Sequence, residues 1–140
     1  MTLDKVAILI KRASLVFEKE ANPIFAKYNL TGSQYKILKY IYMQDSKTAR
    51  IIDLEEEFSM THPTVLGLIS QLQKKGYVVR VNNPNDKRGK LVALTKKAKT
   101  MQKDLKIIGN KAEKLLTKNL TEHEKKELIK LLKKLIDLPQ

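Results

Sequence analysis

A change in residue periodicity at Gly76 constrains this chain more than any other feature. Before Gly76, apolar residues recur every three or four positions, which is the spacing of one helix face. Residues 77–81, Tyr-Val-Val-Arg-Val, are instead β-branched and aromatic, the composition of a strand. Residues 82–89 are rich in turn-forming types, and residues 91–94, Leu-Val-Ala-Leu, indicate a second strand. The sequence therefore predicts a β-hairpin that directly follows a helix.

Two short helices are predicted directly before this hairpin. The first covers Ile51–Phe58, and residues 59–60 form a turn. Thr61 can cap the second helix, with Pro63 in the first turn, where a missing amide costs nothing. Gly76 suits the left-handed position that ends such a helix. Two short helices joined by a tight turn have helix-turn-helix spacing, and the second is the right size for the major groove of DNA.

Two further helices are expected upstream of this unit. The apolar spacing predicts one over residues 3–28, and Pro23 should kink or divide it because proline removes an amide donor and clashes with the preceding turn. Thr31-Gly32-Ser33-Gln34 has the form of a capping box and opens a helix that runs to about residue 44. Residues 45–48 are predicted to be a polar loop.

The C-terminal part predicts two more helices with long apolar stripes. Thr95 can cap the first, and Thr121-Glu122-His123-Glu124 is a capping box for the second. The first of these helices carries a near-heptad seam, made of Ala98, Met101, Leu105, Ile108, Ala112 and Leu115. This seam is either core within one chain or contact between two copies. We favour a dimer contact, because one chain offers little else for the first and the last two helices to cover.

These elements together predict a mainly α fold, of the α+β kind, with a winged helix-turn-helix DNA-binding domain and N- and C-terminal dimerisation helices. Residues 31–94 would form the winged helix-turn-helix domain. Residues 1–30 and 95–140 would form the helical dimerisation region. The chain has 140 residues, a length that suits one such module plus pairing helices.

The charge balance indicates a polyanionic partner. Lysine and arginine total 28 against 15 acidic residues, a net charge of +13. Phosphate contacts supply most of the sequence-independent affinity of proteins for nucleic acid, so such a balance favours DNA over a merely solubilising surface. We find no membrane segment and no signal peptide in the sequence, and expect a cytoplasmic protein.

Enzymatic classes find little support in the sequence. The chain has no cysteine, only two histidines, His62 and His123, and five glycines with no phosphate-binding loop among them. We therefore expect no catalytic residues, no metal site and no cofactor. Glu55-Glu56-Glu57 is better explained as a solvated helix face than as a cation site.

The sequence resembles the MarR family of bacterial transcriptional regulators. The resemblance rests on residues 54–65, on Leu72-Gln73-Lys74-Lys75-Gly76-Tyr77-Val78-Val79-Arg80, on Asp86-Lys87-Arg88 at the expected hairpin tip, and on residues 91–95. It implies a homodimeric regulator, most often a repressor, that binds a palindromic operator in double-stranded DNA. It also implies a recognition helix in the major groove, a wing that reaches the minor groove, and in many members a small-molecule effector that weakens DNA binding.

Candidate DNA-binding residues follow from this arrangement. In the recognition helix they are Thr61, His62, Pro63, Thr64, Gly67, Ser70, Gln71 and Lys74, and in the wing they are Asp86, Lys87, Arg88 and Lys90. Arg88 is expected to enter a narrow minor groove, whereas Asp86 is better explained as holding the loop. For His62, a DNA contact and a plain exposed position are equally supported.

Two alternatives remain open at this point. Tyr28, Tyr35, Tyr40 and Tyr42 either line a ligand pocket or simply pack, and packing is favoured. The whole winged helix could instead serve as a protein-interaction module whose basic surface meets an acidic protein. The basic residues of the wing and the polar face of the second helix argue against that reading.

Overall fold

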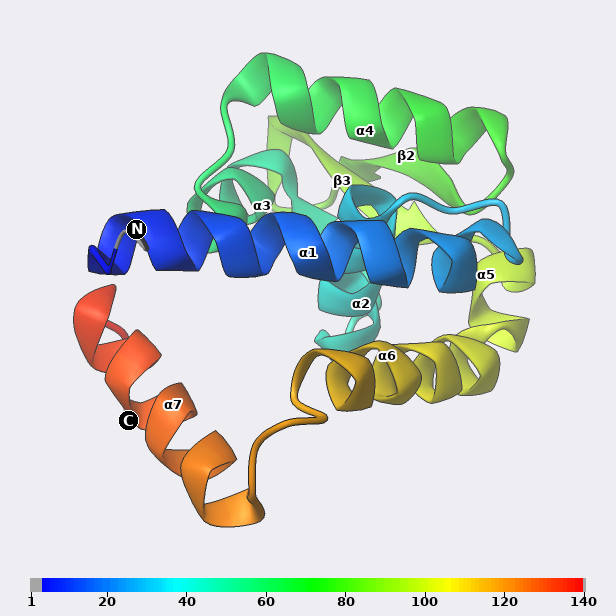
Figure 1. The fold of residues 1–140 in the computed structure, drawn as a ribbon. Coiled ribbons are helices and arrows are strands. Elements are labelled where there is room, and N and C mark those ends of the chain that lie inside the picture. The colour runs from blue at the N-terminus through cyan, green and yellow to red at the C-terminus, as the bar shows by residue number, and fades with distance from the viewer. Residues whose placement is uncertain (1–3, 140) are drawn as a thin grey trace.

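A computed structural model describes residues 4–139, apart from the side chains of residues 86–88 (Figure 1). Within these residues the chain is mainly helical with one small antiparallel sheet, as predicted. In chain order the elements are α1 (Val6–Ala26), α2 (Gly32–Met43), β1 (Thr48–Arg50), α3 (Ile51–Phe58), α4 (His62–Lys74), β2 (Val78–Asn83), β3 (Asp86–Leu94), α5 (Lys96–Thr100), α6 (Gln102–Leu116) and α7 (Glu122–Leu135).

The helix starts are set by the predicted caps. The Thr31 and Thr121 side chains each accept a hydrogen bond from the backbone N–H three residues further on. The Gln34 and Glu124 side chains in turn accept from the backbone N–H of Thr31 and Thr121, which completes both capping boxes. Thr61 and Thr95 cap α4 and α5 in the same way through their hydroxyls. Pro23 was expected to kink or divide the first helix, and it does not divide it, because α1 runs continuously past it.

The sheet contains a strand that the sequence prediction missed. Residues 45–48 were expected to be a loop, but β1 begins at Thr48 and pairs antiparallel with β3, so the strand order is β1-β3-β2. A strand of three residues is too short to show alternation in the sequence. It forms because Ala49 is buried and lies opposite Val92 in the ladder, next to the helix-turn-helix.

The hairpin is longer, and its turn tighter, than predicted. Residues 82–89 were expected to be the turn, but only residues 84–85 turn, and β3 already begins at Asp86. The register changes between Asn82, which pairs with Lys90, and Asn83, which pairs with Asp86. Residues 87–89 therefore form a bulge of the kind that bends a strand and increases its twist. Asparagine-rich sequence here marks an irregular ladder instead of a loop.

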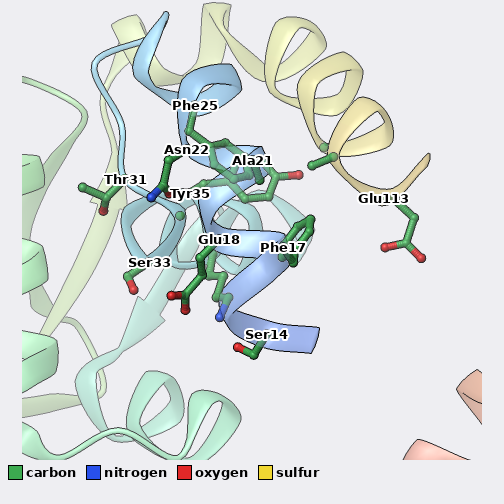
Figure 2. Close-up of a pocket in the computed structure, with 14 residues that line it drawn as sticks. Ser14, Phe17, Glu18, Ala21, Asn22, Phe25, Thr31, Ser33, Tyr35 and Glu113 are labelled. Carbon is green, nitrogen blue, oxygen red and sulfur yellow. The ribbon is translucent and has the colours of Figure 1, made fainter. Parts of the chain in front are cut away.

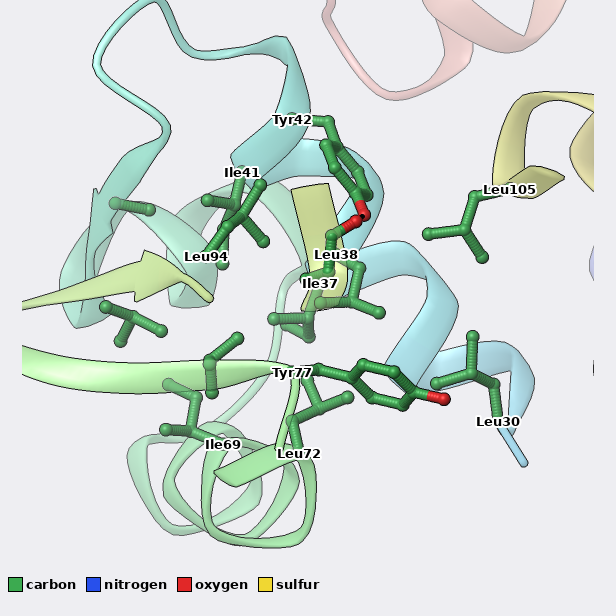
Figure 3. Close-up of a cluster of buried hydrophobic side chains, with 14 of the residues drawn as sticks. Leu30, Ile37, Leu38, Ile41, Tyr42, Ile69, Leu72, Tyr77, Leu94 and Leu105 are labelled. Carbon is green, nitrogen blue, oxygen red and sulfur yellow. Dashed lines mark hydrogen bonds between the residues drawn. The ribbon is translucent and has the colours of Figure 1, made fainter. Parts of the chain in front are cut away.

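The core lies around α2, which passes behind α1 in Figure 1 and contributes the fully buried Ile37, Leu38 and Ile41. Figure 3 shows these side chains facing Ile69 and Leu72 of α4 and Leu94 of β3. The buried faces of α4 and the sheet are therefore turned toward α2. The opposite face of α4 is left exposed to solvent.

The predicted fifth helix is divided at Met101 into α5 and α6, and most of its apolar seam faces the chain's own core. Ala98, Leu105, Ile108 and Ala112 are each at most 4% exposed, in one cluster with Ala21 and Phe25 of α1. The interpretation of this seam as dimer contact was wrong for these four residues. Periodicity shows that a helix has an apolar face, but not which partner covers it, and here α1 lies against α6.

The uncovered apolar surface lies elsewhere, on α7 and the N-terminal half of α1. Helix α7 projects from the body and buries none of its residues (Figure 1). The exposed apolar residues of α7 include Leu128, Ile129, Leu131, Leu132 and Leu135, and Ile136 follows directly after the helix. Those of α1 include Val6, Leu9, Ile10, Leu15 and Val16. Among residues 4–139 we find no helix with the length and apolar character needed to cross a membrane.

Candidate nucleic-acid interface

A tight turn joins α3 to α4. Ser59 adopts a left-handed conformation with φ of 51°, and the Met60 N–H donates to the Glu55 carbonyl at 3.0 Å, which closes the end of α3. Thr61 then caps α4, and Pro63 occupies its first turn. Leu54 of α3 is fully buried. The predicted helix-turn-helix is therefore present, with its ends at the predicted residues.

Helix α4 has one buried face and one exposed polar face. Val65, Ile69 and Leu72 are fully buried, which orients the helix about its axis. All the candidate residues of the recognition helix are exposed on the other sides: Thr61, His62, Pro63, Thr64, Gly67, Ser70, Gln71 and Lys74. The exposed surface thus carries hydroxyl, amide, imidazole and ammonium groups, which can bond base edges and phosphates.

Gly67 opens a gap in the middle of this polar face. A Cβ atom built on Gly67 would meet nothing within 4 Å, so no packing demand explains a glycine here. Glycine costs roughly 1 kcal/mol relative to alanine inside a helix. What the glycine does provide is bare backbone on the face that points away from the core, where another molecule can approach closely.

A side-chain contact joins the start of α4 to α3. His62 Nδ1 lies 3.0 Å from Glu55 Oε2, although both side chains are reachable by solvent. Glu55 is therefore the partner of a candidate DNA-binding residue, and limits the directions that the imidazole can take. Across the described residues, no group of three or more histidine, aspartate or glutamate side chains is placed to hold a metal ion.

Hydrogen bonds centred on the buried amide of Gln34 hold Gln71, and sequence reasoning missed them. Gln34 of α2 is only 2% exposed and donates from Nε2 to Gln71 Oε1 at 2.8 Å. Lys75, at the end of α4, donates to Gln34 Oε1 at 2.8 Å and to the Asn29 carbonyl at 2.7 Å. The sequence marks Gln34 only as part of a capping box, and gives no signal of a bond across 37 positions.

In the wing, the structure places the backbone of every candidate residue in β3. Lys90 is exposed beside the bulge. The side chains of Asp86, Lys87 and Arg88 lie outside the described residues, so their roles stay predictions. Of the lysines that follow the wing, Lys97 is engaged within the protein: its Nζ donates to the Lys75 carbonyl at 2.8 Å and lies 4.6 Å from the centre of the Tyr77 ring.

A cavity of about 430 Å³ lies behind the helix-turn-helix, between α1, the first turn of α2 and α6 (Figure 2). Tyr35 and Phe25 stack in its wall with ring centres 4.8 Å apart, and Glu18 and Ser33 add polar groups. Gly109 of α6 allows Tyr35 to lie so close, because a Cβ there would collide with the Tyr35 hydroxyl. Burial raises the pKa of Tyr35, which stays neutral.

The four tyrosines all pack in or against the core. Tyr35 lines the cavity, whereas Tyr42 packs in the core and its hydroxyl donates to the Ala98 carbonyl. Burial raises the pKa of Tyr42 to about 12, in keeping with a neutral donor. Tyr28 and Tyr40 pack against the core, Tyr40 edge-on to Phe58 at 6.1 Å. Packing is thus confirmed for all four tyrosines, and Tyr35 in addition lines the cavity.

A helix-turn-helix followed by a twisted hairpin defines a winged helix-turn-helix protein. A model described as MarR family matches residues 28–89. The HTH-type transcriptional regulator BilQ of Clostridioides difficile is 31% identical over 122 residues, which cover 87% of this chain and 78% of BilQ. The multiple antibiotic resistance protein MarR of Escherichia coli is 34% identical over 116 residues, 82% of this chain and 79% of that protein.

Comparison with solved structures leads to the same family as comparison of sequences. The crystal structure of a mutant E. coli MarR complexed with operator DNA is similar to this chain with a TM-score of 0.83 and 30% sequence identity, over 93% of this chain and 92% of the other. The chain belongs to the MarR family, and the resemblance noted in its sequence is confirmed. Its fold and sequence are those of DNA-binding transcriptional regulators.

Replacing Gly67 should change protein stability and DNA affinity in opposite directions. Gly67→Ala should raise the free energy of unfolding by about 0.5–1 kcal/mol, because alanine is the better helix former and its methyl group meets no atom. The same methyl group should lower DNA affinity. Chemical denaturation and a DNA-binding titration measure the two effects.

Gly109→Ala is the matched control, since the same change in α6 would collide with Tyr35 and should lower stability. If Gly67→Ala were more stable and bound DNA like the parent protein, the exposed face of α4 at Gly67 would not approach DNA.

Proposed function

We propose that this chain is a homodimeric regulator, acting as a repressor, that binds a palindromic operator and is released from it by a small-molecule effector. The observation that carries the proposal is the exposed polar face of α4, which the buried Val65, Ile69 and Leu72 hold outward. A rigid helix with such a face can enter a major groove. The net charge of +13 supports phosphate contacts around it.

Different parts of the surface have different roles in this proposal. The residues from Thr61 to Lys74 on the exposed face of α4 read base edges in the major groove. The wing, with Asp86, Lys87, Arg88 and Lys90, reaches the neighbouring minor groove, where arginine responds to groove width and potential more than to base identity. Lys87 and Lys90 add phosphate contacts, and Asp86 supports the wing backbone.

Two copies are required to place two recognition helices on one operator. The exposed apolar residues of α7 and of the first half of α1 supply the surface for such pairing, since leaving them in water is costly. Leu131 and Leu135 are 59% and 55% exposed in the single chain. Residues 1–30 and 95–140 would then form the dimerisation region, although α6 also completes the core of its own subunit.

The cavity between α1, α2 and α6 is our candidate effector site. Its volume of about 430 Å³ is within the range of ligand pockets, and its wall combines two stacked aromatic rings with a few polar groups. It adjoins the first turn of α2, which contacts α4 through Gln34. An occupant here would lie beside the element that supports the recognition helix.

Selection from a random DNA pool tests the function directly. We expect the purified protein to enrich a palindrome whose half-sites lie about 10 base pairs apart, one helical turn of DNA. Affinity for the selected site should fall steeply with salt, by about 0.9 in logarithmic slope for each phosphate contact. A pool that yields no consensus would contradict the proposal and favour a protein-interaction module.

The selected site also tests the wing. Arg88→Ala should weaken binding to most sites, with the largest loss where A·T-rich sequence narrows the flanking minor groove. Lys114→Ala in α6 makes the same change in charge far from the wing, and should bind like the parent protein. Equal affinities for the two variants would show that the wing assignment is wrong.

Pairing through α7 is tested by one charge on its apolar face. Leu131→Asp should shift the protein from dimer to monomer in analytical ultracentrifugation, because pairing would bury an unpaired carboxylate. DNA affinity should fall with it. Lys130→Asp is the control. It changes the charge at the neighbouring, exposed position by more than Leu131→Asp does, but the Lys130→Asp protein should stay dimeric. A dimeric Leu131→Asp protein would place the interface elsewhere.

The effector site is tested by filling it. A panel of small aromatic acids and amides, screened by thermal shift, should yield compounds that stabilise the protein and release the selected DNA. Glu18→Trp should bind DNA but lose this response, because the indole occupies the cavity, whereas Glu18→Gln should keep it. A compound that acts equally on all three proteins binds at another site.

A further inference from the structure

We propose that Gln34 is a positioning residue for DNA reading, which fixes the Gln71 amide so that Gln71 presents its N–H group, and not its carbonyl oxygen, to the major groove. The inference rests on the proposed function of α4 and specifies how one of its residues reads DNA. It depends on the bonds that join α2 to the last two turns of α4.

Gln34 is buried and has a partner for both ends of its amide. Its Oε1 accepts from the Thr31 N–H at 3.1 Å and from Lys75 Nζ at 2.8 Å. Its Nε2 donates to Gln71 Oε1 at 2.8 Å. A side chain that is 2% exposed and bonded at both ends cannot rotate without losing several hydrogen bonds away from water.

The donor and acceptor pattern fixes the orientation of both amides. A backbone N–H and a lysine ammonium can only donate, so the Gln34 atom between them must be its carbonyl oxygen. The other end of Gln34 is then the NH2 group, which also only donates. The Gln71 atom that faces it must therefore be an oxygen. Reversing either amide would place two donors against each other.

This orientation limits what Gln71 can recognise. A free glutamine reads adenine with both atoms of its amide, accepting from N6 and donating to N7. In this protein the Gln71 oxygen is bonded to Gln34 of α2, which leaves Nε2 as the other hydrogen-bonding atom of an exposed side chain. Gln71 should therefore act as a donor to base acceptors such as guanine N7 and O6 or thymine O4, or to a phosphate.

The decisive variant is Gln34→Glu. The new carboxylate still accepts from Thr31 N–H and Lys75, and glutamate serves a capping box as well as glutamine does. It has no proton to donate, so Gln71 must turn its own NH2 toward it and present the carbonyl oxygen to DNA. Base preference should then move toward edges that carry a donor, adenine N6 or cytosine N4.

The measurement is binding to a panel of single-base variants of the selected operator. Gln71→Ala should identify the position that Gln71 reads, and Gln34→Glu should change relative affinities at that same position by about 2- to 10-fold, the range of one hydrogen bond. The double variant should match Gln71→Ala alone. Gln102→Glu, the same change on the exposed surface of α6, should leave preferences unchanged.

The outcomes separate this inference from the proposed function. If the parent protein binds no operator, the proposed function fails. If it binds, but Gln34→Glu is folded by circular dichroism and keeps the parent preferences, the positioning role is overturned and the function stands. The same holds if Gln71→Ala changes no preference.

A second variant covers the case in which Gln34→Glu does not fold. Gln34→Met removes the donor to Gln71 without adding a charge, and frees both atoms of the Gln71 amide. The preference at the Gln71 position should then move toward adenine. An unchanged preference in a folded Gln34→Met protein would overturn the proposal.

Discussion

The burial of α2 is the constraint on which the rest of this structure depends. Ile37, Leu38 and Ile41 are completely buried, and the helix packs against α1, α4, α6 and the sheet at once. Truncating one such side chain to alanine typically costs about 2–5 kcal/mol, a large part of the roughly 5–15 kcal/mol that stabilises a domain. The orientation of α4 follows from this packing, since its buried side chains meet the α2 face.

Local signals fixed most of the helices in advance. The threonine caps at Thr31, Thr61, Thr95 and Thr121 act within three residues of sequence, so they can be recognised without knowing the fold. The same is true of Gly76, which has the positive φ of 82° expected at the end of α4. Such features depend on neighbours in sequence, and the structure contains them where they were predicted.

Features that depend on distant partners could not be predicted in this way. Strand β1 exists because of its ladder with β3, and the seam of α5 and α6 is internal because α1 lies on it. The turn residues of the wing gave its position but not its length, since Asn82 and Asn83 stay paired on either side of the bulge. In each case the sequence showed an apolar face or a polar run, and the fold decided what covers it.

The candidate site shows the same division. The exposed face of α4 follows from helical periodicity alone, so its residues could be named from the sequence, although their contacts to DNA remain proposals. The bond from Gln34 to Gln71 could not, because it joins residues 37 positions apart. In our proposal, two features determine how Gln71 would contact DNA. The position of Gln71 on α4 exposes its side chain, and the bond from Gln34 sets which atom of the Gln71 amide faces outward.

The first turn of α2 gives a physical route between the cavity and the recognition helix. Ser33 and Tyr35 line the cavity, and Gln34 between them bonds α4. A ligand can shift the balance between two conformations only as far as its affinities for them differ. Here a small movement is enough to matter, because a bond of 2.8 Å is lost once its atoms are about 3.5 Å apart. An occupant that moves this turn would therefore release Gln71 before any helix had to unfold.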